Sequence, residues 1–166
     1  TLEVGGPVQT MKNVDEATFG IFKERMKQGL WPNLKVVHDP IEGFVVEAAG
    51  HINDWTLIAE YTGEVGRLQT HLHDASDSIK DLLVTGDDRT SLTINASKMG
   101  GIARFLSGIN NNVKGARKKL NCRSVRFSVG GQTRVLLITI RDVKKGERLY
   151  YDYNGHQSNY PTEHFI

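Results

Sequence analysis

Apolar residues recur at helical spacing near the start of the chain, between Val14 and about Gln28. The apolar positions of this stretch are Ala17, Phe19, Ile21, Phe22 and Met26. Acidic residues stand near its beginning and basic residues near its end, and Gly29 follows, an order that suits the helix dipole and a glycine C-cap. The pattern predicts an amphipathic helix that packs against the rest of the chain.

Short stretches rich in β-branched and aromatic residues follow Trp31. They predict strands over residues 34–38, 44–48, 56–65, 124–129 and 132–140. Gly130-Gly131 separates the last two, as in a two-residue hairpin. Residues 67–100 are instead polar and acidic, with one weak helical piece over residues 79–84. Many short strands, few helices and frequent glycines indicate a β-rich α+β fold.

Composition narrows the class of protein. The 166 residues fit one domain that can bury a core, and 39% hydrophobic and 24% charged residues are ordinary for a globular protein. The net charge of +2 is too small to indicate a polyanion partner by itself. No apolar run approaches the length needed to cross a membrane, so we expect no membrane association.

The single cysteine, Cys122, excludes an internal disulfide and a zinc cluster of several cysteines, and it favours a reducing compartment. His71 and His73 stand near Asp74 and Asp77 without further ligands at a recognised spacing. We therefore interpret them as surface residues and predict that the protein holds no metal.

Residues 146–154 read Gly-Glu-Arg-Leu-Tyr-Tyr-Asp-Tyr-Asn. In a strand, side chains alternate between the two faces, so Tyr151 and Tyr153 would point one way, and Tyr150 and Asp152 the other. The two phenols would either line one wall of a pocket or fill the face of a half-buried strand.

Three further segments accompany this one. Residues 42–44 read Glu-Gly-Phe, residues 60–64 read Glu-Tyr-Thr-Gly-Glu, and residues 103–111 read Ala-Arg-Phe-Leu-Ser-Gly-Ile-Asn-Asn. Taken in order, the four segments resemble the motif series of the SET-domain protein lysine methyltransferases. With the ending Tyr-Pro-Thr-Glu-His-Phe over residues 160–165, they resemble in particular the plant Trithorax-related histone-tail monomethyltransferases.

The resemblance implies a SET domain of small sheets, with an N-terminal helix and a C-terminal segment threaded through an earlier loop in a pseudoknot-like way. Residues 1–30 would form a helical extension, and residues 31–154 the catalytic domain, with a variable insert at about 66–100. Residues 155–166 would close the cofactor site. There, Tyr160 and Phe165 would either fold over the adenine or pack as a terminal segment.

The resemblance also implies S-adenosylmethionine as the cofactor and a lysine channel lined by tyrosines. Tyr153 would sit beside the transferring methyl, and Tyr61 would form another wall. Taken without the other segments, Tyr61 would be interpreted as a core tyrosine whose hydroxyl bonds to the backbone, and the order of the four segments favours the channel wall instead. A tyrosine rather than a phenylalanine at Tyr151 predicts that one methyl group is added.

The predicted cofactor-binding residues come from two segments and the last tyrosine. They are Glu42, Gly43, Phe44, Arg104, Phe105, Leu106, Ser107, Gly108, Ile109, Asn110, Asn111 and Tyr153. Ser107, Gly108 and Ile109 stand where the general SET pattern reads Asn-His-Ser, which leaves their side-chain roles open. The alternative for residues 104–111 is a helical or turn segment in the core.

The expected function is monomethylation of the lysine in an Ala-Arg-Lys-Ser segment (lysine 27) of the histone H3 tail, in the nucleus and as a monomer. The alternatives are a lysine methyltransferase of another protein and a non-catalytic SET fold that binds chromatin or peptides. One basic run offers either contact with nucleic-acid phosphates or a solvated loop. Its members are Lys114, Arg117, Lys118, Lys119 and Arg123.

Overall fold

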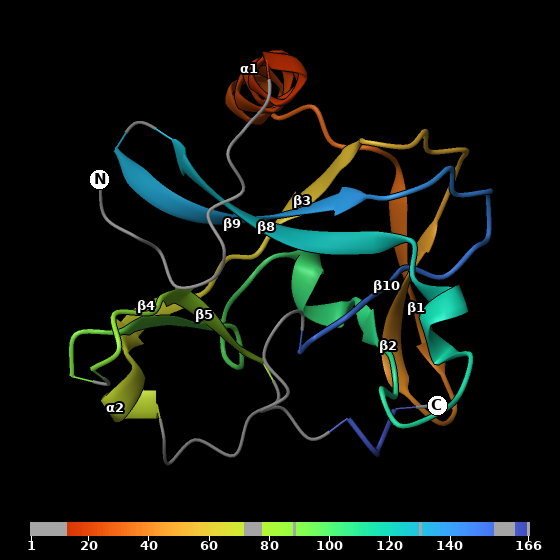
Figure 1. Ribbon diagram of the computed structural model, residues 1–166. Helices are drawn as coiled ribbons and strands as arrows, with labels where there is room; N and C mark the ends of the chain where they lie inside the picture. The colour runs from red at the N-terminus through yellow and green to blue at the C-terminus, as the bar shows by residue number, and fades with distance from the viewer. Residues whose placement is uncertain (1–12, 72–77, 88, 130, 155–161, 166) are drawn as a thin grey trace. The chain divides into compact units, whose positions relative to one another are not determined.

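The computed structural model describes residues 13–71, 78–87, 89–129, 131–154 and 162–165 (Figure 1). The chain divides into two compact units, each described by itself below. The first unit combines Thr1–Trp31, Tyr61–Gly101 and Arg126–Val135, and the second combines Pro32–Glu60, Ile102–Val125 and Leu136–Ile166. The predictions for residues 1–12, His73, Gly130 and Tyr160 lie outside the described residues.

The first unit begins with helix α1, Asn13–Gln28, which confirms the predicted helix, although Ala17 and Ile21 of the predicted apolar face are exposed. Its face is anchored by Phe22, which is buried, and by Phe19, whose ring centroid lies 4.4 Å from that of Phe127. The helix ends where Gly29 takes a left-handed φ of 65° and the Leu30 amide donates to the Arg25 carbonyl. Such a turn satisfies carbonyls at the helix end, and glycine adopts it without steric cost.

The first unit also contains an antiparallel sheet of order β4-β6-β5. Its elements are β4 (Glu64–Arg67), the short helix α2 (Leu68–His71), β5 (Ile79–Leu83) and β6 (Leu92–Asn95). The predicted helical piece over residues 79–84 is therefore wrong, because these residues pair with β6 from Ile79↔Asn95 to Leu83↔Leu92. Pairing with a strand distant in the sequence outweighed the local spacing of apolar residues.

The predicted strand over residues 56–65 is two strands in different sheets, β3 (Leu57–Glu60) and β4. The interruption lies at residues 61–63. A Cβ added to Gly63 would lie 2.4 Å from the Asn95 carbonyl oxygen, so the backbone passes β6 at a distance that only glycine permits.

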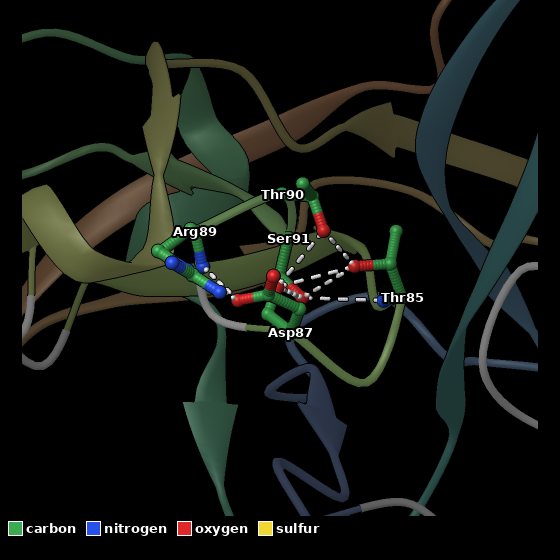
Figure 2. A network of polar contacts seen from close by, with 5 residues as sticks. All are labelled: Thr85, Asp87, Arg89, Thr90 and Ser91. Carbon is green, nitrogen blue, oxygen red and sulfur yellow. Dashed lines mark hydrogen bonds and ion pairs between the residues drawn. The ribbon is translucent and has the colours of Figure 1, made fainter.

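The turn between β5 and β6 is held by a polar network around Asp87 (Figure 2). The Asp87 carbonyl accepts bonds from the backbone amide of Ser91 at 2.8 Å and from the hydroxyls of Thr85, Thr90 and Ser91. Its carboxylate accepts from the Arg89 amide at 2.9 Å. These bonds hold the turn that leads from β5 into β6.

The second unit contains the hairpin of β1 (Leu34–Asp39) and β2 (Gly43–Ala48), paired in register from Leu34↔Ala48 to Asp39↔Gly43. A further sheet has the order β3-β9-β8, where β8 is Cys122–Val129 and β9 is Gln132–Thr139. Leu57, Leu136 and Leu137 are fully buried where β3 pairs with β9. The strands predicted over residues 34–48 and 124–140 are thus confirmed.

The C-terminal segment runs between two earlier parts of the second unit. On one side, the Leu149 amide donates to the Val46 carbonyl, and the Ala48 amide donates to the Glu147 carbonyl. On the other side, β10 (Tyr150–Tyr151) pairs in parallel with β7 (Ser107–Gly108), next to the 3₁₀ helix η1 (Ile102–Phe105). This is the threaded arrangement that the SET resemblance implied, although the tyrosine strand is only two residues long.

Two negative findings concern the described residues alone. No helix among them is long and apolar enough to cross a membrane. No group of three or more His, Cys, Asp or Glu side chains in the same part of the chain is arranged to hold a metal ion.

Candidate active site

Tyr151 and Tyr153 lie on the same side of the C-terminal segment, as the alternation predicts. Their ring centroids are 4.5 Å apart and their planes are inclined by 33°. Tyr151 is 2% exposed, whereas Tyr153 is half-buried. The Tyr153 hydroxyl donates a hydrogen bond of 2.7 Å to the Leu106 carbonyl. Because its proton is committed to that carbonyl, the phenol oxygen presents its lone pairs elsewhere, as an acceptor.

Asn121 fixes the backbone that leads into these tyrosines. It is fully buried, its Oδ1 accepts from the Tyr150 amide at 2.8 Å, and its Nδ2 donates to the Arg148 carbonyl at 2.7 Å. The thiol of Cys122 donates to the same Oδ1. Burial raises the pKa of the Cys122 thiol to about 12, which keeps the thiol protonated and able to donate. The side chain of Asn121 therefore fixes the position of the backbone from Arg148 to Tyr150.

Residues 104–111 run along the other side of that segment. Leu106, Ser107, Gly108 and Ile109 are all buried, and the Ser107 amide donates to the Leu149 carbonyl. The Ser107 Oγ is buried without a hydrogen-bond partner in the described part of the chain. A buried hydroxyl in that state costs free energy unless another group reaches it.

The Phe165 ring covers Gly108 and meets Tyr153. A Cβ added to Gly108 would lie 2.4 Å from a Phe165 ring carbon, and the Tyr153 and Phe165 centroids are 4.8 Å apart. Asn110 ties this ending in place through bonds of 3.1 Å to the carbonyls of Glu163 and Phe165. The Phe165 ring thus packs against the backbone of residue 108.

Asn111 joins the same cluster from the side of Asp152. Its Nδ2 donates to the Asp152 carboxylate at 3.0 Å, and its backbone amide donates to the Thr162 hydroxyl. The Asn111 Oδ1 is buried and has no partner among the described residues. Asp152 thus serves as an acceptor within the fold.

Gly43 and Phe44 begin strand β2 and lie next to residue 105. Gly43 has a φ of 76°, and a Cβ added there would meet nothing within 4 Å. Phe44 is 60% exposed, and its ring meets the edge of Phe105 at 6.0 Å. Arg104 places its guanidinium 5.1 Å from the centroid of the same Phe105 ring. The structure therefore brings together the two predicted cofactor segments, which lie some 60 residues apart.

Arg148 connects the tyrosine segment to the loop before Gly43. Its guanidinium lies 2.5 Å from the Asp39 carboxylate and 2.9 Å from that of Glu42. Asp39 also accepts from the amides of Ile41 and Glu42, which closes the turn. Sequence reasoning missed Arg148 and Asn121 as positioning residues, because their partners are far away in the chain and no local pattern marks them.

The Asp39 carboxylate should make stability depend on pH. The Glu42 amide, the Arg148 guanidinium and the Ile41 amide together lower the pKa of this carboxyl to about 2. Its contribution is therefore complete above the unfolded pKa of about 3.9 and is lost as the pH falls through about 2. Urea unfolding should show that Asp39→Asn is less stable than the parent at about pH 5 and that the gap narrows as the pH falls. A gap that stays constant between those limits would contradict this assignment.

Tyr61 lies in the first unit, where it is 4% exposed. Its amide donates to the Val135 carbonyl at 2.8 Å and its hydroxyl to the Ser78 carbonyl at 2.9 Å. The bond from hydroxyl to backbone is the one expected for a core tyrosine, and it fixes the direction in which the phenol oxygen presents its lone pairs.

Residues 43–154 match the family model of the SET domain, so the chain belongs to the SET domain family. Among its relatives is the probable histone-lysine N-methyltransferase ATXR5 of Ricinus communis, 49% identical over 161 residues, which are 97% of this chain and 43% of that protein. The histone-lysine N-methyltransferase ATXR5 of Arabidopsis thaliana is 48% identical over 99% of this chain and 43% of its own length. The chain thus spans less than half of these curated relatives.

Solved structures agree with this assignment. A crystal structure of ATXR5 in complex with histone H3.1 mono-methylated on an arginine superimposes with a TM-score of 0.84 at 50% identity, over 95% of this chain and 74% of that one. The similarity to a SET-domain structure at this identity confirms the β-rich fold with small sheets and an N-terminal helix.

Proposed function

We propose that this chain is the catalytic region of an S-adenosylmethionine-dependent histone lysine methyltransferase. We propose further that it adds one methyl group to the lysine of an Ala-Arg-Lys-Ser segment of the histone H3 tail. The observation that carries the proposal is the Tyr151–Tyr153 pair, anchored on the Leu106 carbonyl. It stands in a chain similar over nearly its whole length to proteins named histone-lysine N-methyltransferases.

The residues present fit the cofactor. Two of the buried polar atoms that lack partners among the described residues belong to the segment 104–111, namely the Ser107 Oγ and the Asn111 Oδ1. Both are acceptors that could receive bonds from an ammonium or a ribose hydroxyl. Gly43 leaves open space beside its backbone, and the exposed ring of Phe44 offers an apolar face. The residues that would hold the cofactor are therefore Gly43, Phe44, Ser107, Asn111 and Phe165. When bound, S-adenosylmethionine supplies an electrophilic methyl group on a sulfonium.

The tyrosines prepare the lysine amine. A free lysine has a pKa near 10.4, so presenting it neutral at pH 7 costs on the order of 4 kcal/mol. The apolar surroundings of buried Tyr151 disfavour the charged amine and so reduce that cost. The Tyr153 oxygen, with its own proton held by Leu106, can accept a bond from the amine and orient the nitrogen lone pair. A phenol with an ordinary pKa near 10 is poorly matched to a general base, so its task is orientation.

Tyr61 is proposed as a further wall of the lysine channel, on the strength of family membership. Its hydroxyl proton is also committed to a carbonyl, that of Ser78, which leaves the oxygen as an acceptor.

Replacing Tyr151 with phenylalanine should shift the product from one methyl towards two or three. Removal of a buried hydroxyl leaves room for a methylated amine to rotate and removes a group that can fix it. Mass spectrometry of the peptide after prolonged reaction measures the distribution. Tyr150→Phe is the matched control, since that ring lies beside the cations of Lys119 and Arg148. Unchanged monomethylation in Tyr151→Phe would show that another feature limits the product.

Mass spectrometry of an H3 tail peptide incubated with the chain and S-adenosylmethionine tests the proposal as a whole. A single methyl on the lysine of Ala-Arg-Lys-Ser is expected, and none on a peptide that carries arginine at that lysine. Transfer to another lysine would correct the substrate, and retained cofactor binding without transfer to any histone peptide would favour a binding module.

The remaining assignments rest on the same proposal. A histone-modifying region would act in the nucleus, and we propose that it acts as a monomer. We also propose the division into a helical extension over residues 1–30, a catalytic domain over residues 31–154 and a closing segment over residues 155–166.

A further inference from the structure

Basic and acidic residues are separated along this chain, although its net charge is only +2. Residues 89–141 contain no aspartate or glutamate, and they contain eleven of the 21 lysines and arginines. All 19 acidic residues lie outside this stretch. Local charge rather than net charge decides whether a surface attracts a polyanion.

The exposed part of this charge is concentrated around the 3₁₀ helix η2, Ala116–Lys119, in the second unit. Ala116 is buried and anchors the turn, and Gly115 before it has a φ of 90°. Lys114, Arg117 and Lys118 are exposed, and no described acidic side chain forms a salt bridge with them. We call residues 114–119 the basic loop.

A second pair of exposed cations, Lys144 and Lys145, follows Arg141, which is hydrogen-bonded to Leu120, the residue directly after the basic loop. Arg141 donates to the Leu120 carbonyl and pairs with Glu147, and Glu147 accepts from the Lys144 amide at 3.0 Å. Glu147 is thus already neutralised by Arg141. The exposed Asp142 is the acidic residue that stands beside this pair, and its carboxylate accepts from the Asp54 amide.

Two aromatic rings in this region each have a cation beside them, and the Trp55 side chain remains 47% exposed. The Lys119 ammonium lies 5.6 Å from the Tyr150 centroid, and the Arg123 guanidinium lies 4.7 Å from that of Trp55. Proteins that hold single strands usually leave aromatic faces open for base stacking. Residues 114–119 contain no aromatic residue, so the basic loop offers cations for phosphates rather than rings for stacking. Contacts to phosphates fix the position of a duplex without reading bases.

We propose that Lys114, Arg117, Lys118, Lys144 and Lys145 form a surface that binds the phosphate backbone of duplex DNA without sequence preference. The choice of DNA among polyanions rests on the proposed function, since histone tails are presented from particles wrapped in DNA. A second contact of this kind raises the effective concentration of the tail at the active site.

Fluorescence anisotropy with a labelled duplex of about 30 base pairs, measured at several salt concentrations, tests the surface. A plot of the logarithm of the binding constant against the logarithm of the salt concentration falls with a slope of about 0.9 for each phosphate contact. The triple variant Lys114→Ala, Arg117→Ala, Lys118→Ala should reduce that slope by about two to three and weaken binding at least about tenfold at low salt. The matched control removes three exposed lysines elsewhere, Lys23, Lys27 and Lys98, and should keep the parental slope.

Equal salt-dependence slopes for the parent and the basic-loop variant would refute the proposal that this surface binds DNA. The absence of duplex binding by the parent would refute it as well. Tighter binding to phosphatidylserine vesicles than to the duplex at equal salt would overturn the choice of DNA. Methylation of the free tail peptide should be the same in the parent and in the basic-loop variant. If the parent methylates no histone peptide and the variant still loses duplex binding, the proposed function fails while the surface stands.

Discussion

Replacing Tyr153 with phenylalanine should lower the rate of methyl transfer about a hundredfold or more while the protein remains folded. The ring stays, so its contacts with Tyr151 and Phe165 are retained. The hydroxyl that bonds to the Leu106 carbonyl is lost, and with it the acceptor that orients the amine. Removing one oriented polar group from an active site commonly costs about 10² to 10³ in rate.

Single-turnover rates on the H3 tail peptide measure this effect, with cofactor affinity from calorimetry alongside. Tyr150→Phe is the matched control because it removes a phenol from the same segment and should retain most of the activity. A Tyr153→Phe enzyme that transfers methyl within about threefold of the parent would show that geometry alone, without the hydroxyl, suffices.

The helices and strands that depend on a local pattern of residues could be predicted from the sequence. Helix α1 follows from apolar residues at helical spacing, and β8 and β9 follow from alternation on either side of a glycine pair. Strand β5 could not, since Ile79, Leu82 and Leu83 also fit one face of a helix. Only pairing with β6 decides between the two, and that pairing is not visible in a single segment.

The candidate site, too, could be predicted from the sequence only in part. Tyr151 and Tyr153 could be placed on one face from their spacing alone. The parallel pairing of Tyr150–Tyr151 with Ser107–Gly108 joins segments more than 40 residues apart, and only the resemblance to the SET family implied it. The roles of Asn121 and Arg148 depend on where that pairing puts residues 147–150, so no motif could mark them beforehand.

Replacing Asn121 with alanine should destabilise the protein by about 3 kcal/mol or more. The substitution removes the side chain that bonds the Tyr150 amide and the Arg148 carbonyl. Asn121 is fully buried, so water does not reach this place in the parent protein. Each buried polar group left unsatisfied costs about 1–3 kcal/mol. For a chain of this size, the melting temperature should fall by about 10 °C.

Asn112→Ala is the matched control for this prediction. Asn112 is exposed, and its side chain donates to the Glu163 carboxylate at 3.0 Å, so its replacement should change the free energy of unfolding by no more than about 0.5 kcal/mol. Thermal unfolding followed by circular dichroism compares the two variants under one condition. Equal melting temperatures for Asn121→Ala and Asn112→Ala would mean that water can replace the buried side-chain amide, and that the backbone bonds of the tyrosine segment, to Val46, Ser107 and residue 121, are enough to hold it.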